Sequence, residues 1–369
     1  MNELTFLLAA AEELRRRQEP FLLATVVRVR GSAYRAPGAR MLLTCDRWIA
    51  GSVSGGCLEG DVARKGWWRT EGGPVVVTYD AREDAELGGG FGLGCGGVVD
   101  VLLERGSASV AEALRFLDEC RRGQWRGGLA TVFGGGAAPL GGRVAVRSDG
   151  TVRAWGAFDR ATRRRLEDDC ARTAASGKGM VASVPGASTG ALEALIEAIR
   201  PPPRLFVFGA GHDVVPVVEI AATVGWEVIV CEPHARFGAR ERFGRADAVW
   251  FGEPDELAAR IDASDRALAI VMSHHYERDR ATLDALLGTR ALYIGMLGPR
   301  RRTVRMLDEL GLADGDPRLH APVGLDLGAE TPQEIALAIL AEGQAVLTQA
   351  SATRLRERSG PIHVSAAAE

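Results

Sequence analysis

Arg204-Leu-Phe-Val-Phe208-Gly-Ala-Gly-His-Asp213 is an apolar strand that runs directly into a glycine turn. An apolar helix follows, and then a second strand that ends at Glu232. In dinucleotide-binding βαβ units the first glycine makes a tight turn and the second lets the backbone approach a diphosphate, while an acidic residue after the next strand binds ribose hydroxyls. Gly209, Gly211 and Glu232 stand in these three places. The pattern predicts a Rossmann-like sheet and favours NAD-like ligands over 2′-phosphorylated ones.

The third glycine of this fingerprint is replaced by Val214, so the helix and the strand are expected to pack less closely. The helix begins near His212, where the pyrophosphate of a dinucleotide would lie. Three further apolar runs predict strands of the same sheet, at 248–251, 268–272 and 291–294. We therefore expect a doubly wound parallel sheet that binds ligands beyond the carboxyl ends of its strands.

Two polar segments follow strands at this edge. Ser273–Asp279 contains three candidate metal ligands, His274, His275 and Asp279, but adjacent histidines at a strand end point in opposite directions. A hydrogen-bonding or packing role is therefore favoured over a metal site. Gly295–Arg302 ends in three arginines, of which Arg300 is the first. Arginines beside a glycine turn suit an anion such as phosphate, and a solvated run of charge explains them equally well.

Pro201-Pro-Pro203 marks the clearest domain boundary, because three prolines cannot continue a helix and form a stiff spacer. At 369 residues the chain is too long for one ordinary core. We predict an N-terminal mixed α+β domain over 1–200 and a C-terminal Rossmann-like α/β domain over 201–350. Residues 351–369 are expected to form a weakly ordered tail.

The sequence before the prolines alternates predicted strands and helices. Apolar runs predict strands at 21–29, 39–44, 74–79, 98–103, 128–133, 143–146 and 151–154, and helical periodicity predicts helices at 2–18, 62–67, 109–121 and 161–175. Gly177–Gly190 is predicted to be a loop, and Ala191–Ile199 a short helix.

Ser52-Val-Ser-Gly-Gly-Cys-Leu-Glu-Gly-Asp61 places a cysteine among turn residues just before a helix. Ser54 or Gly55 is expected to cap that helix, so that Cys57 falls in or near the first turn. There the helix dipole and free N–H groups would make the thiol more reactive. The backbone N–H groups of Ser54, Gly55 and Gly56 would be available to a phosphate.

A second cysteine, Cys95, is wrapped by glycines before the strand at 98–103. Small buried hydrophobes are the alternative interpretation of both cysteines. If they are functional, Cys57 and Cys95 are expected to share one cleft and to contact a metal or hold transferable sulfur. If the ligand also carries a phosphate, Arg40 is the basic residue that we expect near that phosphate.

The composition excludes several classes of protein. The net charge of -3 gives no reason to expect nucleic acid or an acidic membrane surface as a partner. The six cysteines show no CxxC pairing, which argues against a zinc ribbon or a disulfide scaffold and for a reducing compartment. No apolar run is long enough to span a bilayer, and the N-terminus lacks the basic start of a signal peptide. We expect a cytoplasmic globular protein.

Short motifs in family order through most of the chain resemble the xanthine dehydrogenase accessory factors, the XdhC/CoxI family of molybdenum-cofactor chaperones. In the first half the matching segments are Ala24-Thr-Val-Val, Gly31-Ser, Pro37-Gly-Ala-Arg-Met41, Gly51-Ser-Val-Ser-Gly-Gly-Cys-Leu-Glu-Gly60 and Gly92-Leu-Gly-Cys-Gly96. In the second half they are Phe208-Gly-Ala-Gly-His212, Met272-Ser-His-His, Gly295-Met-Leu-Gly-Pro-Arg-Arg-Arg302 and Pro322-Val-Gly-Leu-Asp-Leu-Gly-Ala-Glu-Thr-Pro332. Gly96, where many relatives have asparagine, and Val214 depart from the family pattern.

The resemblance implies a homodimeric, non-catalytic chaperone that binds molybdopterin or its dinucleotide form. Such a protein protects the cofactor while a cysteine desulfurase supplies the terminal sulfido ligand. It then delivers the cofactor to a molybdenum hydroxylase, such as xanthine or carbon monoxide dehydrogenase. The pterin and metal would suit Cys57 and Cys95, and the nucleotide would suit Gly209, Gly211 and Glu232, so we expect the two halves to build one site.

Two other functions fit parts of the sequence. An NAD-dependent oxidoreductase would bind NAD(P) in the Rossmann half and use His274 as acid–base, although no separate substrate pocket can be identified from the sequence. A binding module with a vestigial Rossmann half that serves only in dimerisation is the second alternative.

Overall fold

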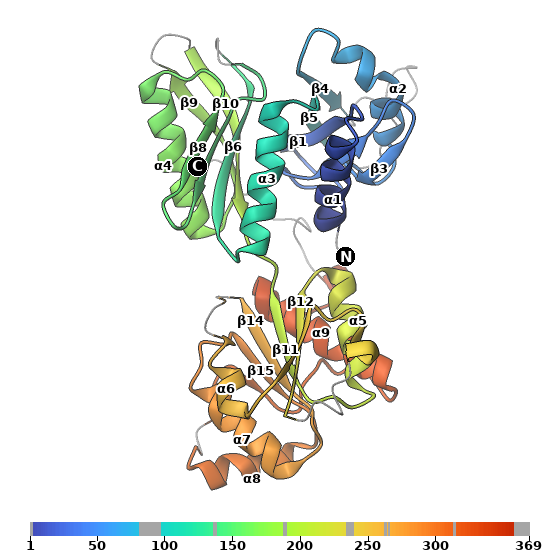
Figure 1. Ribbon diagram of the computed structural model, residues 1–369, viewed down its shortest axis with the longest axis vertical. Helices are drawn as coiled ribbons and strands as arrows, with labels where there is room; N and C mark the ends of the chain where they lie inside the picture. Colours follow the sequence, from blue (N-terminus) through green and yellow to red (C-terminus); the bar gives the residue numbers. More distant parts are fainter. Residues whose placement is uncertain are drawn as a thin grey trace. The chain divides into compact units, whose positions relative to one another are not determined.

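The computed structural model describes residues 3–80, 97–135, 139–186, 190–233, 240–261, 264, 266–312 and 315–357 (Figure 1). The chain forms two compact units, Glu3–Pro201 and Pro202–Glu357. Each unit has its own sheets and its own core. The fold class predicted from the sequence is confirmed, because antiparallel sheets make up the first unit and a parallel sheet makes up the second.

The N-terminal unit contains two five-stranded antiparallel sheets. Sheet A has the strand order β3-β2-β1-β5-β4, and sheet B has the order β8-β7-β6-β10-β9. The strands of sheet A are β1 (Leu22–Arg30), β2 (Arg40–Leu43), β3 (Trp48–Gly51), β4 (Val75–Asp80) and β5 (Val98–Arg105). Those of sheet B are β6 (Gly127–Gly134), β7 (Arg143–Arg147), β8 (Val152–Trp155), β9 (Met180–Gly186) and β10 (Gly190–Ile199). The helices are α1 (Glu3–Arg16), α2 (Glu59–Arg69), α3 (Ala108–Arg122) and α4 (Arg160–Ser176).

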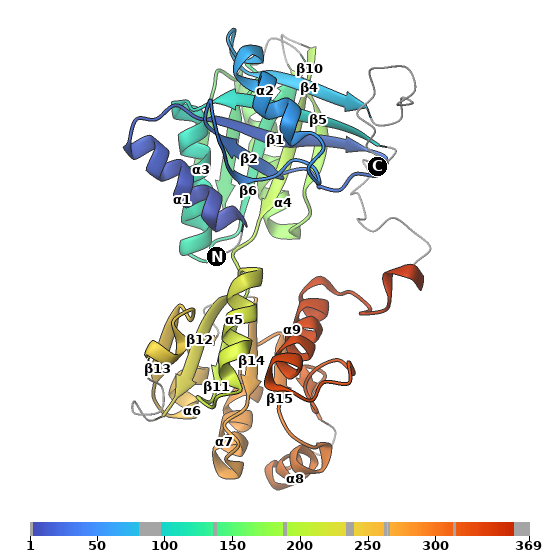
Figure 2. The ribbon, with the colours of Figure 1, turned by 90° about the vertical axis from the view of Figure 1, so that its right-hand side faces the viewer.

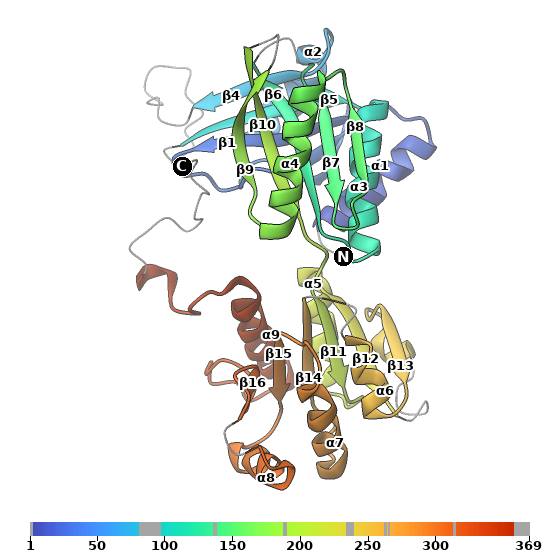
Figure 3. The ribbon, with the colours of Figure 1, turned by 90° about the vertical axis from the view of Figure 1, so that its left-hand side faces the viewer.

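The two sheets lie face to face, each with one helix on its outer side. Val62 of α2 packs with the outward-facing strand residues of sheet A (Figure 2). Leu166 and Cys170 of α4 do the same on sheet B (Figure 3). Apolar side chains fill the space between the sheets: Val27, Leu102, Phe133 and Leu195. α1 and α3 share a fourth cluster with strands of both sheets.

The prediction for Gly177–Ile199 was wrong. The segment forms strands β9 and β10, and β10 pairs with β6 on one side and β9 on the other. Ala, Leu and Glu favour a helix locally, but successive side chains of β10 serve opposite faces of the sheet. Leu192, Ala194 and Ile196 enter the core under α4. Leu195 points toward sheet A, so tertiary packing overrides the local propensity.

Ion pairs join the facing surfaces of the two sheets. Arg143 of β7 binds Glu104 of β5 through both terminal nitrogens, and Nη1 also donates to the carbonyl of Gly141 at 2.7 Å. Both side chains are almost fully buried, with 3% and 4% of their surface exposed. A buried charge without its partner is strongly destabilising, so each member of this pair depends on the other.

We therefore expect Arg143→Met to lower the free energy of unfolding of the N-terminal unit by about 3 kcal/mol. The cause is the carboxylate of Glu104, which would stay buried and unpaired. Arg143→Met combined with Glu104→Met should cost clearly less than the single change, because no charge is left behind. Urea denaturation followed by tryptophan fluorescence measures both variants, and a double variant less stable than Arg143→Met would contradict this account.

The C-terminal unit is built on a six-stranded parallel sheet of order β13-β12-β11-β14-β15-β16. In chain order this is 3-2-1-4-5-6, the order of dinucleotide-binding folds, which reverses between β11 and β14. The strands are β11 (Arg204–Phe208), β12 (Glu227–Glu232), β13 (Ala248–Phe251), β14 (Ala267–Val271), β15 (Tyr293–Met296) and β16 (Leu319–His320). The helices are α5 (Val214–Val224), α6 (Pro254–Ala258), α7 (Tyr276–Leu287), α8 (Arg300–Leu310) and α9 (Pro332–Thr348).

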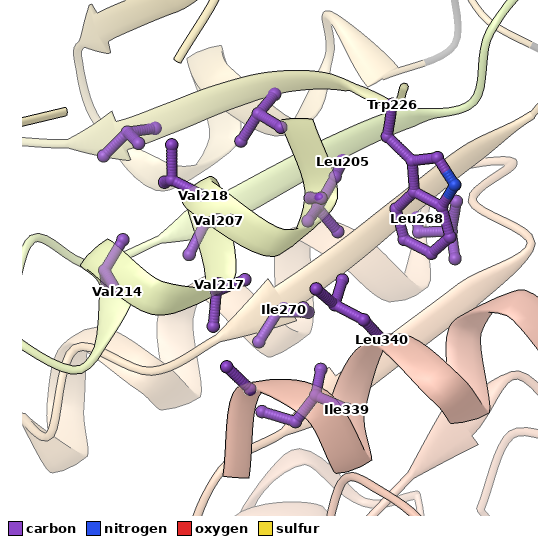
Figure 4. Close-up of a cluster of buried hydrophobic side chains, with 14 of the residues drawn as sticks. Leu205, Val207, Val214, Val217, Val218, Trp226, Leu268, Ile270, Ile339 and Leu340 are labelled. Atoms are coloured by element: carbon purple, nitrogen blue, oxygen red, sulfur yellow. The ribbon is translucent and has the colours of Figure 1, made fainter. Parts of the chain in front are cut away.

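Apolar side chains cover both faces of this sheet. On one face, α5 and α9 bury a cluster that includes Val217, Ile339 and Trp226 against β11 and β14 (Figure 4). On the other face, residues of α6, α7 and α8 pack against the opposite side chains of the same strands. Val214, at the third glycine position, is fully buried in the first cluster. None of the described helices is both long and apolar enough to cross a bilayer.

Candidate functional site

The loop between β3 and α2 is organised around the carboxylate of Glu59. Its Oε1 accepts hydrogen bonds from the backbone N–H groups of Val53 at 3.0 Å and Ser54 at 2.7 Å. Its Oε2 accepts from the N–H of Gly56 at 3.1 Å and from the hydroxyl of Ser54. The Ser54 hydroxyl oxygen in turn accepts from the N–H of Leu58 at 3.0 Å. An acid that is only 2% exposed therefore closes the loop on itself.

This arrangement corrects the expected position of the helix. α2 begins at Glu59, after an N-cap at Leu58, so neither Ser54 nor Gly55 is the cap, and Cys57 lies near the first turn but just before the helix. The physical reason is the Ser54 hydroxyl, which binds the amide of Leu58 within the loop instead of capping a helix that starts there. The amides of Ser54 and Gly56, which we expected to face a phosphate, are bound by Glu59.

Cys57 is exposed at the tip of this loop, beside exposed Gly55 and Gly56. Gly56 has φ +116°, a conformation that favours glycine, and nothing lies within 4 Å of the position of its missing β-carbon. The β-carbon position of Gly55 lies 3.3 Å from the ring of Tyr34. The loop thus presents a thiol to solvent on a backbone that Glu59 holds in place.

Burial and hydrogen bonding shift the pKa of the Glu59 carboxyl in opposite directions. Burial raises the pKa of its carboxyl, but the donors from Ser54 and Val53 outweigh that effect and leave the pKa below its ordinary value. The acid is therefore ionised at neutral pH. A charged acceptor makes stronger hydrogen bonds than a neutral one, which stabilises the loop around Cys57.

The second cysteine, Cys95, lies outside the described residues, and its predicted proximity to Cys57 stays a prediction. The topology of sheet A bears on it. Gly51, the carboxyl end of β3, is level with Leu103 near the end of β5, whereas Val98 at the start of β5 pairs with Arg30 at the carboxyl end of β1. At that end Gly97 lies so close to the carbonyl of Ser32 that a β-carbon would collide with it.

Arg40 is held in an ion pair between the sheets. Its Nη2 lies 2.6 Å from Oε2 of Glu197 on β10, and its Nη1 donates to the carbonyl of Gly38 at 2.8 Å. Its side chain is 10% exposed. Glu197 therefore neutralises the charge that we expected to serve a phosphate.

The glycine turn after β11 has the expected geometry. Gly209 has φ +136°, and a β-carbon there would lie 2.7 Å from the carbonyl oxygen of Met272 on the adjoining segment. Only glycine fits this turn, because the two strands of the switch point come together here. A β-carbon on Gly211 would collide with Oδ1 of Asp213. His212, between them, is exposed.

A pocket opens at the carboxyl edge of the sheet next to this turn. It is shallow and open to solvent. Its lining comes from the ends of four strands and from α6 and α7: Phe208, Gly209, Cys231, Pro233, Gly252, Pro254, Leu257, Ser273, Arg278 and Thr282. Arg278 also binds Glu232, with 3.1 Å between Nη1 and Oε1, and Glu232 is 3% exposed.

His274 lies beside the glycine turn, with its Cδ2 4.0 Å from the β-carbon position of Gly211. It adopts φ +62°, which is unusual for a residue with a side chain. Its Nε2 lies 2.6 Å from Oδ2 of Asp213, and its side chain is 62% exposed. Among the described residues, no cluster of three or more His, Cys, Asp or Glu side chains is placed to hold a metal ion.

A buried network fixes the segment that carries His274. Asp279 is 1% exposed and accepts from the hydroxyl of Ser273 at 2.5 Å and from Nη2 of Arg302 at 2.7 Å. The Ser273 hydroxyl oxygen accepts from the N–H of His275 at 3.2 Å. Arg302, the third arginine of its run, thus supports the site, while Arg300 is exposed at the start of α8.

Comparison with known proteins identifies both units. The description "XdhC and CoxI family" matches residues 14–80, and "XdhC Rossmann domain" matches residues 205–342. A Bacillus subtilis (strain 168) protein described as a probable xanthine dehydrogenase subunit is 31% identical over 331 residues, which are 88% of this chain and 92% of that protein. The chain belongs to the XdhC/CoxI family.

Two further proteins resemble this XdhC/CoxI family member over most of its length. The "Molybdenum cofactor insertion chaperone PaoD" of Escherichia coli (strain K12) is 24% identical over 334 residues, 87% of this chain and 81% of its own. A crystal structure described as a xanthine dehydrogenase from Bacillus halodurans has a TM-score of 0.73 and 26% identity, with 94% of this chain and 98% of the other covered.

Several residues of this family member that shape the two sites carried no recognisable signal in the sequence. Glu59 looked like an ordinary first-turn acid, since acidic residues are common at helix N-termini. Asp213 and Arg278 are polar residues on helix ends, and their partners lie 61 and 46 positions away. The spacing of Gly209, Gly211 and Glu232 predicted the edge of the sheet but not these partners.

Proposed function

We propose that this protein binds the molybdenum cofactor and takes part in the maturation of a molybdenum hydroxylase. The observation that carries the proposal is the exposed thiol of Cys57 on a loop held by Glu59. A cofactor of this kind supplies a soft molybdenum–dithiolene centre, which thiolate ligands suit. Cys57 would hold the metal end, and Cys95 is proposed as its partner. The names of the relatives from Bacillus subtilis and Escherichia coli support the same role.

The proposal also assigns each end of the cofactor to one unit. The loop amides are bound by Glu59 and Arg40 is bound by Glu197, so this region suits a thiolate contact better than a phosphate. In contrast, the turn at Gly209 and the pocket beside Arg278 suit a diphosphate and a nucleoside. We therefore assign the nucleotide of a dinucleotide cofactor to the C-terminal unit. NAD(P) is the alternative ligand of that pocket.

The proposal extends to finer steps, which are those that the family resemblance implies. The bound cofactor would be kept from water while a cysteine desulfurase adds the sulfido ligand, and a homodimer would then pass it to a client of the xanthine or carbon monoxide dehydrogenase type. The test is to purify the protein from cells with an active molybdenum pathway. Molybdenum and pterin in near-stoichiometric amounts would support the proposal, and their absence from protein that is correctly folded would overturn it.

Glu232→Ala should weaken binding of the dinucleotide form by about tenfold or more, since charge-assisted hydrogen bonds to a ribose are worth about 1–3 kcal/mol. Binding of molybdopterin without the nucleotide should hardly change. Glu232→Gln keeps the shape of the side chain and controls for loss of the buried pair with Arg278. Isothermal titration calorimetry with both cofactor forms makes the comparison. Equal losses for the two forms, or no loss for either, would rule out this use of Glu232.

A further inference from the structure

Asp213 and His274 stand where the diphosphate of a Rossmann ligand is expected. Asp213 is the residue before α5, and its carboxylate bends back over Gly211. The second glycine of the fingerprint is the position at which the backbone approaches a diphosphate. In this structure the carboxylate of Asp213 is the anion at that position.

His274 binds the carboxylate of Asp213 by a hydrogen bond. Its Nε2 is 2.6 Å from Oδ2 of Asp213, so this ring nitrogen donates its N–H to the carboxylate. The segment around it is fixed by Asp279, which binds both Ser273 and Arg302. His274 is therefore a hydrogen-bond donor placed beside the glycine turn, with an internal anion as its acceptor.

A bound diphosphate and the carboxylate of Asp213 compete for one position. Two anions in contact repel each other, and the repulsion is stronger near a protein surface than in bulk water. Gly209 and Ser273, on the two sides of the turn, both line the adjoining pocket. A nucleoside bound in that pocket would direct its phosphates toward Asp213 and His274.

We propose that the carboxylate of Asp213 competes with the ligand's diphosphate for one position. His274 donates its N–H to whichever of the two anions occupies that position. On binding, the side chain of Asp213 turns away and the N–H of His274 donates to a phosphate oxygen instead. The ligand class is nucleoside diphosphates, including the diphosphate of a dinucleotide. This inference rests on the proposed nucleotide site and adds the two residues that set its affinity for phosphate.

Asp213→Asn tests the competition, because it removes the charge and keeps the shape. Calorimetric titrations in EDTA would compare ADP and CDP with adenosine and cytidine, which lack phosphate. We expect the variant to bind the diphosphates about tenfold or more tightly than the wild type, with unchanged affinity for the nucleosides. Asp284→Asn, which changes an exposed acid of α7, should leave all four affinities unchanged.

His274→Asn tests the shared donor, since asparagine tolerates the left-handed backbone conformation but is too short to reach the phosphate. In the Asp213→Asn background it should abolish most of the gain in diphosphate affinity. If the wild type binds nucleoside diphosphates and Asp213→Asn binds them no more tightly, the competition is refuted while the nucleotide site stands. If neither protein binds any of the four ligands, both ideas fall.

Discussion

The Cys57→Ala variant should fold as stably as the wild type and retain less than about a tenth of its bound molybdenum cofactor. Cys57 is exposed, so its side chain contributes little packing. Its sulfur is the soft ligand of the loop, and alanine offers the metal no donor. Molybdenum by mass spectrometry and pterin by fluorescence, both per mole of purified protein, measure the loss.

Cys45 provides the matched control. It is also an exposed free cysteine of sheet A, but it lies in the β2–β3 turn, at the end of the sheet opposite the Cys57 loop. Cys45→Ala should keep its full cofactor content. Wild-type molybdenum content in Cys57→Ala, or equal losses in both variants, would remove Cys57 from the site.

Glu59→Ala should lower the free energy of unfolding of the N-terminal unit by about 3 kcal/mol or more and release the cofactor as well. Three backbone amides and a hydroxyl would lose a charged acceptor, and hydrogen bonds to charged groups contribute about 1.5–3 kcal/mol each. Without them the loop no longer holds Cys57 in one place. Hydrogen exchange at the amides of Ser54 and Gly56 and urea denaturation provide the measurements.

Glu71→Ala, which removes an exposed acid just after α2, should change neither stability nor cofactor content.

The folded pKa of Glu59 lies below its ordinary value, so its stabilising contribution is complete above about pH 4.3, the ordinary glutamate value. It is lost as the pH falls through the lower folded pKa. The protection of the loop amides, measured against their intrinsic exchange rate at each pH, should therefore fall in acid in the wild type but not in Glu59→Gln. Slow exchange at these amides in Glu59→Ala would show that other contacts hold the loop.

The sequence predicted the elements whose patterns are local. The apolar strands on either side of the turn at Gly209 were identified because parallel strands buried on both faces are continuously apolar. Thr331-Pro-Gln-Glu334 has the pattern of a capping box with proline at N1, and α9 begins there with both hydrogen bonds of the box. Such signals need only a few neighbouring residues, so a single chain carries them in full.

The predictions that were wrong concern residues whose structure depends on partners distant in the sequence. Residues 191–199 have helical composition and become a strand only because β6 and β9 pair with them on both sides. Arg40 was expected beside a phosphate, since nothing in the order of the chain brings Glu197 to it. The start of α2 was misplaced because a serine before two glycines resembles a cap, whereas here it closes the loop onto Glu59.

The place of β10 in the chain has a consequence for how the protein is made. This strand is synthesised last in its unit, yet it lies between β6 and β9 and carries the acids that neutralise two arginines of sheet A, Arg28 through Glu193 and Arg40 through Glu197. During translation, neither sheet can reach its final state until β10 has left the ribosome. A nascent chain that stalls before residue 190 should thus remain protease-sensitive throughout and should not accumulate as a half-folded domain.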